Sequence, residues 1–427
     1  MNYQEFLVHI FERYSGNVKL GLERMIDILA AMGNPQEKIK GIHIAGTNGK
    51  GSVSAMCEAL SLGQGFSTGM NTSPHLIDYC ERFRFNGKNV HYTEIMKIHD
   101  QFSQIFDKNE ASFFEITTAI AFQMMHINNV DTSIMEVGLG GRLDGTQPFK
   151  SSVCVITTIS LDHPKSLGSS LAEIAFEKAG IIKDNTPVVL GNIVQEAKDV
   201  ILKVAHDKNA PVLAFNKDFF IENVTISDQG TFMDYSFKNY HLKNLQINLL
   251  GYHQAVNAAT ALTSFITYCE SLNRTIDLDN LRSSLNKVNW FGRMQILHRN
   301  PLVIIDGAHN EEGIHILIEN SKKMFPNRTI RFVVAILRDK KLDNMIAEIC
   351  SYANEIYISK NHSERAADLE EQIDVAKKSN IPYFAFDDVK TAALSAYQKT
   401  DKNDILIITG SLYTIAEILA EKDNLFQ

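Results

Sequence analysis

A short glycine-rich segment near the start of the chain constrains its fold more than any other feature. Residues 44–52 read Ile-Ala-Gly-Thr-Asn-Gly-Lys-Gly-Ser, at the end of an apolar run over residues 41–45. Glycines at a strand-to-helix junction let backbone N–H groups approach phosphate oxygens, and the helix N-terminus adds partial positive charge. Lys50 can neutralise terminal phosphates and Ser52 can face a metal, although Gly51 between them departs from the Walker A spacing. The segment therefore predicts a polyphosphate-binding loop made of Gly46, Thr47, Asn48, Gly49, Lys50, Gly51 and Ser52.

The residues that follow this loop alternate between β-type and helical patterns. The apolar runs cover residues 41–45, 132–137, 153–159 and 187–190, and the helical patterns between them cover residues 53–62, 92–106 and 171–179. Ser170 and Glu173 form a capping-box pattern for the last of these helices, and Gly180 is typical of a helix end. The alternation predicts an α/β fold with a mostly parallel, P-loop-type sheet and helices on both faces.

The second half of the chain predicts a separate domain. Residues 217–250 combine aromatic and β-branched residues with a turn signal at 228–230, which indicates a small β excursion. A second α/β alternation begins at Pro301, with apolar runs over residues 302–305, 330–335, 355–358, 383–386 and 405–408. We therefore predict an N-terminal domain over residues 1–292, a linker over 293–300, and a smaller Rossmann-like α/β domain over 301–427.

Composition narrows the class of protein. The net charge of −8, with no sizeable basic block, argues against a nucleic-acid partner. The five cysteines are far apart and lack zinc-ligand spacing, as expected for reduced thiols. The first 15 residues lack the pattern of a signal peptide, and no apolar stretch is long enough to span a bilayer. We expect a cytoplasmic protein with no membrane partner.

Three polar side chains follow apolar runs, where a doubly wound sheet places its ligands. Ser73 could ligate a metal, although a simple Ser-Pro turn also accounts for it. Glu136 lies near the end of the run over residues 132–137 and precedes three glycines, and its carboxylate suits Mg²⁺ better than a purely structural role. His163 follows the run over residues 153–159 and could ligate a second metal or be structural.

Four further positions carry more than one interpretation. Asn257, at the start of a helical pattern, could contact an adenine edge or cap the helix. Arg293, at the domain junction, could clamp phosphates or be a surface arginine. Asp306 and His309 follow the first strand of the second domain, and residues 409–413 follow the last, where such sheets bind ligands.

Taken in order, these motifs resemble the folylpolyglutamate synthase/dihydrofolate synthase family, within the Mur ligase superfamily. The resemblance rests on residues 46–52, 72–76, 81–87, 136–144, 162–163, 177–181, 253–259, 291–294, 306–310 and 410–413. It implies an ATP-dependent ligase that adds L-glutamate to the glutamate side-chain carboxylate of a tetrahydrofolate through an acyl phosphate. Dihydropteroate is a second candidate acceptor, and a monomer is expected. The first predicted domain would bind ATP, and the C-terminal one would bind the incoming glutamate.

The same resemblance assigns roles to single residues. It implies that Ser73, Glu136 and His163 hold magnesium, with two ions expected. Lys178, which the sequence alone explains as a cation at a helix C-terminus, falls on the family's carbamylated lysine. Nucleotide contacts fall on Asn257, Arg293, Asp306 and His309, and the catalytic groups on Lys50, Lys178 and His309. Asp306, His309 and the Ser411 loop lie where the glutamate would sit.

Departures from the family pattern are mild. Glu311 stands where a proline is common, and Ser170 stands where a threonine is expected after Gly168. Two other functions compete with the folate ligase. One is a Mur-type ligase of cell-wall precursors, and the other is a P-loop ATPase switch that forms no amide bond. The pair of motifs over residues 72–76 and 81–87 favours folate, and the second α/β domain argues against the switch.

Overall fold

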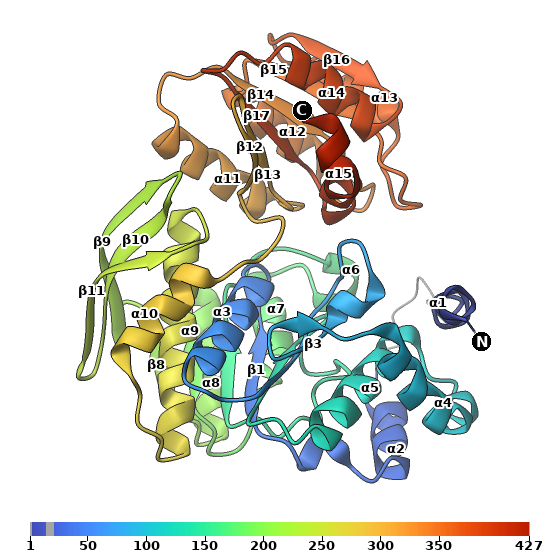
Figure 1. Cartoon of the computed structure of the whole chain (residues 1–427), viewed down its shortest axis with the longest axis vertical. Coiled ribbons are helices and arrows are strands. Elements are labelled where there is room, and N and C mark those ends of the chain that lie inside the picture. Colours follow the sequence, from blue (N-terminus) through green and yellow to red (C-terminus); the bar gives the residue numbers. More distant parts are fainter. Residues whose placement is uncertain (1, 14–20, 427) are drawn as a thin grey trace. The chain divides into compact units, whose positions relative to one another are not determined.

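The computed structural model describes residues 2–13 and 21–426, which form two compact units. Each unit combines segments that are distant in the sequence, and the second is drawn mainly in orange and red (Figure 1). Unit 1 comprises Met1–Val224, Phe232–Asn248 and Gln254–Val288. Unit 2 comprises Thr225–Thr231, Leu249–His253 and Asn289–Gln427.

Unit 1 is built on an eight-stranded sheet with the order β4-β3-β2-β5-β1-β6-β7-β8. The strands from β2 to β8 in this order are parallel, and β3 and β4 extend one edge in antiparallel fashion. Their bounds are β1 Gly41–Ala45, β2 Thr68–Asn71, β3 Phe83–Phe85, β4 Lys88–Asn89, β5 Thr132–Glu136, β6 Val153–Ile156, β7 Val188–Leu190 and β8 Val212–Ala214. The predicted mostly parallel α/β sheet is confirmed.

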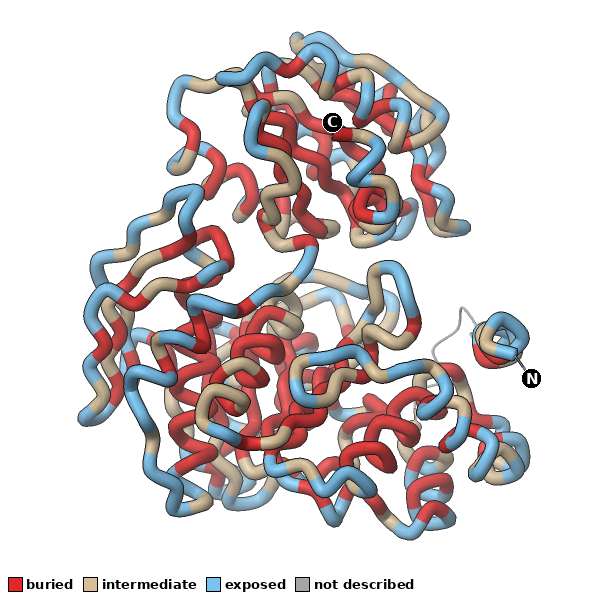
Figure 2. The backbone as a smooth tube through the Cα atoms, viewed as in Figure 1, coloured by how far each residue is buried: buried red, intermediate tan, exposed pale blue. Residues whose placement is uncertain are grey.

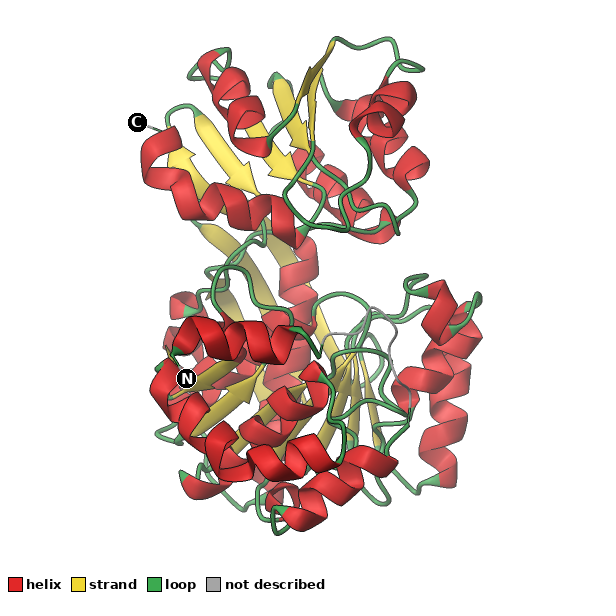
Figure 3. Cartoon of the chain, turned by 90° about the vertical axis from the view of Figure 1, so that its right-hand side faces the viewer, coloured by secondary structure: helices red, strands yellow, loops and turns green. Residues whose placement is uncertain are grey.

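Helices cover both faces of this sheet, as the alternating sequence pattern predicts (Figure 3). On one face, α5, α7 and α8 pack against strand residues such as Met135 and Ile156. On the other, α3 lies against β1, β2 and β5, and Cys57 on α3 contacts α9. The helix bounds are α1 Tyr3–Phe11, α2 Glu23–Ala31, α3 Lys50–Gly63, α4 Tyr92–Lys108, α5 Phe113–Ile127, α6 Pro164–Leu167, α7 Leu171–Ala179, α8 Gln195–Asp207, α9 Tyr252–Ser271 and α10 Leu278–Lys287.

Strands covered on both faces are buried along their whole length, and the core follows them (Figure 2). Every residue of β1, β5 and β6 is buried. This explains why the corresponding sequence runs are mostly apolar or small on both faces rather than alternating, with His43 and Glu136 as the exceptions. It also means that ligands can meet this sheet only at the strand ends.

Helix α7 shows one correct prediction and one correction. The Ser170–Glu173 capping box is present, with the Ser170 side chain accepting the Glu173 backbone N–H. Gly180 does follow the helix, but its φ is −62°, so it is not the left-handed cap that a stop glycine usually supplies. Its small size is required instead, because a Cβ there would lie 2.3 Å from Cβ of Arg142.

The β excursion predicted over residues 217–250 is a three-stranded sheet with the order β11-β10-β9. Its strands are β9 Phe219–Ser227, β10 Gly230–Phe237 and β11 Tyr240–Ile247. The predicted turn joins β9 to β10, with Gly230 at φ 134°. The tip of this hairpin belongs to unit 2.

Unit 2 carries a six-stranded sheet with the order β12-β13-β17-β14-β15-β16, parallel except for β12. The strands are β12 Gln295–Arg299, β13 Leu302–Ile305, β14 Ile330–Val334, β15 Glu355–Ser359, β16 Tyr383–Phe386 and β17 Ile405–Thr409. The helices are α11 Glu311–Met324, α12 Leu342–Tyr352, α13 Leu369–Ala376, α14 Val389–Gln398 and α15 Leu412–Leu425. The segment predicted as a linker, 293–300, thus contains β12, which pairs with β13.

Candidate functional site

The predicted phosphate loop lies between the end of β1 and the start of α3. Gly46 and Gly49 adopt φ angles of 149° and 87°, a region that side-chain-bearing residues avoid. A Cβ on Gly46 would also lie 1.9 Å from Oγ1 of Thr157. The loop therefore needs glycine at both positions, and the N-terminus of α3 that follows is a ready anion-binding site.

Two lysine ammonium groups converge on the backbone of this loop. Lys50 Nζ lies 3.1 Å from the carbonyl oxygen of Gly46 and 3.2 Å from that of Thr47. Lys178, at the end of α7, donates to the same Gly46 carbonyl at 2.8 Å. Gly46 and Lys178, which are 132 positions apart in the sequence, are thus joined by this hydrogen bond.

Burial makes Lys178 an unusual lysine. Loss of solvent lowers its pKa to about 7, and the nearby charge of Lys50 acts in the same direction. The carboxylates of Asp162 and Asp144 oppose this shift without cancelling it. A large fraction of Lys178 is therefore a neutral amine near neutral pH, which makes it nucleophilic.

Ser52 of the phosphate loop and the predicted metal ligands Ser73 and Glu136 all lie at the carboxyl end of the unit 1 sheet. Ser52 Oγ is buried and has no hydrogen-bond partner among the described residues. Glu136, the last residue of β5, is buried, and its Oε2 accepts the backbone N–H of Ser73 at 3.2 Å. Since β5 pairs directly with β1, Glu136 lies beside the strand that leads into the phosphate loop.

His163 occupies the left-handed position before α6, with φ 53°. Its side chain is 41% exposed, and its Nε2 lies 3.9 Å from the carboxylate of Asp162. It is thus a half-exposed imidazole beside an acid, at the same carboxyl end of the sheet, where it follows β6.

Asn257, on α9, packs against the phosphate loop. A Cβ on Gly49 would lie 2.6 Å from Asn257 Oδ1, so the asparagine side chain contacts that glycine. Asn257 is buried, and its Nδ2 donates to Gln254 Oε1 at 3.2 Å. The alternative of a simple helix cap does not describe this position, because Asn257 lies inside α9.

In unit 2, Arg293 and Asp306 form a second cluster. The buried Asp306 carboxylate accepts the backbone N–H groups of Met294 and Ala308, both at 2.8 Å. Burial raises the pKa of Asp306, while Arg293 and these two hydrogen bonds act in the opposite direction. Arg293 is half-buried, and its Nη1 lies 3.0 Å from the Gly292 carbonyl oxygen.

His309 follows in the same loop. Its Nδ1 lies 2.9 Å from the Gly307 carbonyl oxygen, which ties the imidazole to the loop backbone. Asn310 caps α11 through the Gly313 N–H, and Ser411 caps α15 through the Thr414 N–H. The loops after β13 and β17, two paired strands, are thus both anchored at helix starts.

Two family models match this chain. The Mur ligase middle domain matches residues 44–265, and the Mur ligase glutamate ligase domain matches residues 292–412. A dihydrofolate synthase/folylpolyglutamate synthase from Bacillus subtilis is 35% identical, covering 97% of this chain and 98% of that protein. The chain belongs to the folylpolyglutamate synthase/dihydrofolate synthase family of Mur ligases.

Solved structures of this family agree with the fold. A folylpolyglutamate synthase from Mycobacterium tuberculosis, complexed with ADP, has a TM-score of 0.92 and 29% identity, with 99% of each chain covered. A bifunctional folylpolyglutamate synthase/dihydrofolate synthase with Mn, AMPPNP and L-glutamate bound has a TM-score of 0.86 and 28% identity. That comparison covers 98% of this chain and 97% of the other.

Sequence reasoning missed two threonines that hold the phosphate loop of this family member. Thr157 donates to the Asn48 carbonyl at 2.6 Å, and Thr158 Oγ1 accepts the Asn48 N–H at 3.0 Å. The Thr158 carbonyl accepts the Thr47 N–H at 2.9 Å. Both follow β6, so two adjacent hydroxyls at a strand end next to β1 were the available signal.

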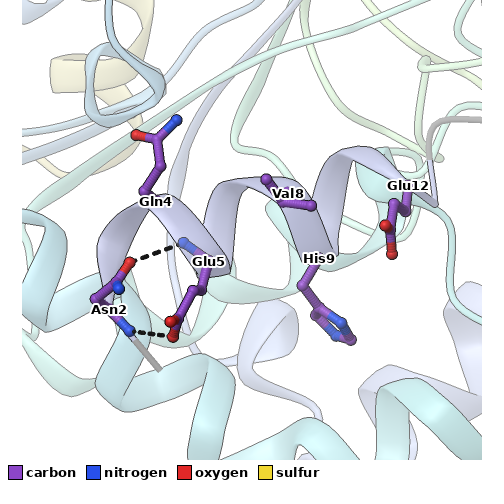
Figure 4. A pocket seen from close by; sticks show the side chains of 6 residues that line it. All are labelled: Asn2, Gln4, Glu5, Val8, His9 and Glu12. Atoms are coloured by element: carbon purple, nitrogen blue, oxygen red, sulfur yellow. Dashed lines mark hydrogen bonds between the residues drawn. The ribbon is translucent and has the colours of Figure 1, made fainter.

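Other features of the described residues do not add to the site. A hollow of about 490 Å³ is confined to α1 and its two cap residues (Figure 4), where it is lined by Asn2, Gln4, Glu5, Val8, His9 and Glu12. None of these is a predicted site residue. No helix in the described ranges has the length and apolarity needed to cross a bilayer. His, Cys, Asp and Glu side chains form no cluster of three or more suited to a metal within residues 2–13 and 21–426.

Proposed function

We propose that this chain is an ATP-dependent ligase that joins L-glutamate to the glutamate side-chain carboxylate of tetrahydrofolates. Dihydropteroate is the second candidate acceptor. Its use would make the enzyme both a folylpolyglutamate synthase and a dihydrofolate synthase, the two activities that the names of the relatives from Bacillus subtilis and Escherichia coli combine. The observation that carries the proposal is the phosphate loop with Lys50 and Lys178 on one Gly46 carbonyl. Family membership supplies the substrate class.

The chemistry needs an activated carboxylate, because a free carboxylate does not react with an amine at neutral pH. An oxygen of the folate carboxylate attacks the γ-phosphorus of ATP, and ADP leaves, which forms an acyl phosphate. The amine of glutamate then attacks the acyl carbon; phosphate leaves, the amine loses a proton, and an amide results. Lys50 and the N–H groups at the start of α3 offset the negative charge on the transferred phosphoryl group.

Magnesium fits the donors at the carboxyl end of the unit 1 sheet. The unpartnered, buried Ser52 hydroxyl and the buried Glu136 carboxylate are the hard oxygen ligands that Mg²⁺ takes, together with phosphate oxygens and waters. Ser73 and His163 complete the proposed set, and we propose two ions, as the family resemblance implies. When bound, magnesium would draw charge from the phosphate oxygens.

Lys178 is the proposed carbamylation site. Its neutral amine attacks the carbon of CO₂, a C–N bond forms, and one proton is released, which leaves an anionic carbamate. Burial favours this step because it disfavours the competing ammonium form, with a pKa of about 7. The carbamate would place a further anionic oxygen donor beside the phosphate loop.

The remaining roles follow from the family resemblance. Asn257, Arg293, Asp306 and His309 are the proposed nucleotide contacts. Asp306, His309 and the Ser411 loop are the proposed contacts of the incoming glutamate. We further propose that the chain is a cytoplasmic monomer whose only partners are its small-molecule substrates. Light scattering after size exclusion would test the monomeric state.

Product mass tests the proposal directly. Purified protein is given ATP, Mg²⁺ and L-glutamate with tetrahydrofolate or dihydropteroate in separate reactions, and the products are weighed by mass spectrometry. Gain of one glutamate on tetrahydrofolate alone indicates a polyglutamate synthase, and gain on both acceptors indicates a bifunctional enzyme. ADP release without any gain refutes the proposal in favour of an ATPase switch, and turnover of a nucleotide-sugar peptide refutes it in favour of a cell-wall ligase.

A further inference from the structure

A buried asparagine on a neighbouring loop is directed at the start of α15. Asn361 lies two residues beyond β15 and is only 2% exposed. Its Oδ1 accepts the backbone N–H of Ser363 at 3.1 Å, which fixes the orientation of the amide. Both amide hydrogens therefore face α15, with Nδ2 3.2 Å from Ser411 Oγ and 3.1 Å from Thr414 Oγ1.

The three side chains form a closed hydrogen-bond network. Thr414 donates its hydroxyl proton to the Ala335 carbonyl at 2.7 Å. Because this proton is used, the Thr414 hydroxyl oxygen is the acceptor in its hydrogen bonds with Ser411 Oγ, 2.7 Å away, and with the Asn361 amide. The Ser411 oxygen in turn accepts the Thr414 N–H at 3.1 Å as well as the Asn361 amide. The single proton and both lone pairs of the Ser411 hydroxyl are thus all used within unit 2.

This saturation changes what the Ser411 loop can offer a ligand. A substrate could bond to the Ser411 hydroxyl only by breaking one of these buried bonds, which is costly because the released partner has no water to replace it. Gly410 adds a backbone constraint, since its φ is 113° and a Cβ there would lie 2.6 Å from the Ala335 carbonyl oxygen. The loop between β17 and α15 is therefore fixed by Asn361, Thr414 and Ala335 together.

We propose that Asn361 is a positioning residue for the amino-acid substrate: its amide fixes the Ser411–Thr414 cap, so that the start of α15 meets glutamate in one geometry. The inference rests on the proposed function, because it takes glutamate as the ligand of this loop. It assigns the Ser411 hydroxyl a structural role and leaves contact with the substrate to other groups of the loop.

Steady-state kinetics with the full chain test this role. In N361A we expect the KM for glutamate to rise about tenfold, the size of effect that follows from leaving a buried acceptor unpaired, with the KM for ATP within about twofold. S411A should raise the same KM to a similar extent, and the double variant should be no worse than either, because both act through one network. T414S, which keeps the hydroxyl, should resemble the wild type, whereas T414V should resemble N361A.

A matched control separates positioning from general loosening. Gln372 is a buried amide in the same unit that joins the Ile336 N–H to the Ser359 carbonyl, and its hydrogen bonds among the described residues do not reach α15. Q372A should lower the melting temperature as N361A does but leave the KM for glutamate unchanged. An equal rise in that KM in Q372A would overturn the proposal.

Two further results would overturn it or its basis. If S411A raises the KM for glutamate far more than N361A, and the two effects multiply in the double variant, the Ser411 hydroxyl contacts the substrate and the positioning role is wrong. Wild-type turnover is measured first: no use of glutamate refutes the proposed function and this inference with it. Normal wild-type turnover with an unchanged KM in N361A refutes the positioning role alone.

Discussion

Chemical trapping of CO₂ on Lys178 is the sharpest test of the site in unit 1. An amine reacts with CO₂ only in its neutral form, and the pKa of Lys178 is lowered to about 7 by burial and by Lys50. At pH 8 about nine-tenths of such a group is neutral, against roughly 0.4% of an ordinary lysine with a pKa near 10.4. The reactive fraction is therefore about 200-fold larger at Lys178.

The assay labels the protein with ¹³C-bicarbonate, traps carbamates as esters with a trialkyloxonium salt, and locates the label by peptide mass spectrometry. We expect the label at Lys178 at pH 8, falling steeply as the pH drops below 7, because protonation removes the nucleophile. Lys208, an exposed lysine that pairs with Asp184, is the internal control and should stay unlabelled. Absence of label at Lys178, or equal label at Lys208, would refute the reasoning.

Three other substitutions test separate parts of the site. G46A should raise the KM for ATP at least tenfold in steady-state kinetics and lower the free energy of unfolding in urea by about 1–3 kcal/mol, because its Cβ clashes with Thr157. In the control variant G145A the Cβ would lie 3.4 Å or more from its neighbours, so neither the KM nor the stability should change. S52A should leave unfolding by urea nearly unchanged, because the Ser52 hydroxyl has no hydrogen-bond partner among the described residues. It should weaken the binding of Mn²⁺–AMPPNP about tenfold, measured by calorimetry, and unchanged binding would remove Ser52 from the metal site. D306N should lower the free energy of unfolding in urea by about 1–3 kcal/mol, because the single amide oxygen cannot accept both backbone N–H groups that the two carboxylate oxygens accept. A decrease below about 0.5 kcal/mol would contradict this account.

The central strands of unit 1 could be predicted because burial on both faces makes them mostly apolar runs. The runs at residues 41–45 and 132–137 correspond to β1 and β5, and the phosphate loop lies at the junction predicted for it. The fold class followed from this alternation alone. Periodicity says little about strand order, however, and the antiparallel edge formed by β3 and β4 depends on tertiary contacts.

The contacts that shape the site were largely out of reach of the sequence. Lys178 is explained locally by the dipole of α7, and only the fold brings its ammonium to Gly46, 132 residues away. Gly180 was predicted for its backbone freedom, yet it is required for its small size beside Arg142. Asn361 lies in a polar loop with no recognisable motif, because its importance comes from which helix start its amide reaches.

The composition of unit 2 has a consequence for building chimaeras. A cut at residue 288 would separate the C-terminal segment from two pieces encoded earlier, Thr225–Thr231 and Leu249–His253. Those pieces are bonded into the unit: Asp228 pairs with Arg299 at 2.8 Å, and the Tyr252 N–H donates to Asn320 at 2.8 Å. Exchange of glutamate-ligase domains between relatives should therefore carry the tip of the β9–β10 hairpin and the segment Leu249–His253, which includes the start of α9. During synthesis, these two pieces are made before the residues that they bind, Arg299 and Asn320.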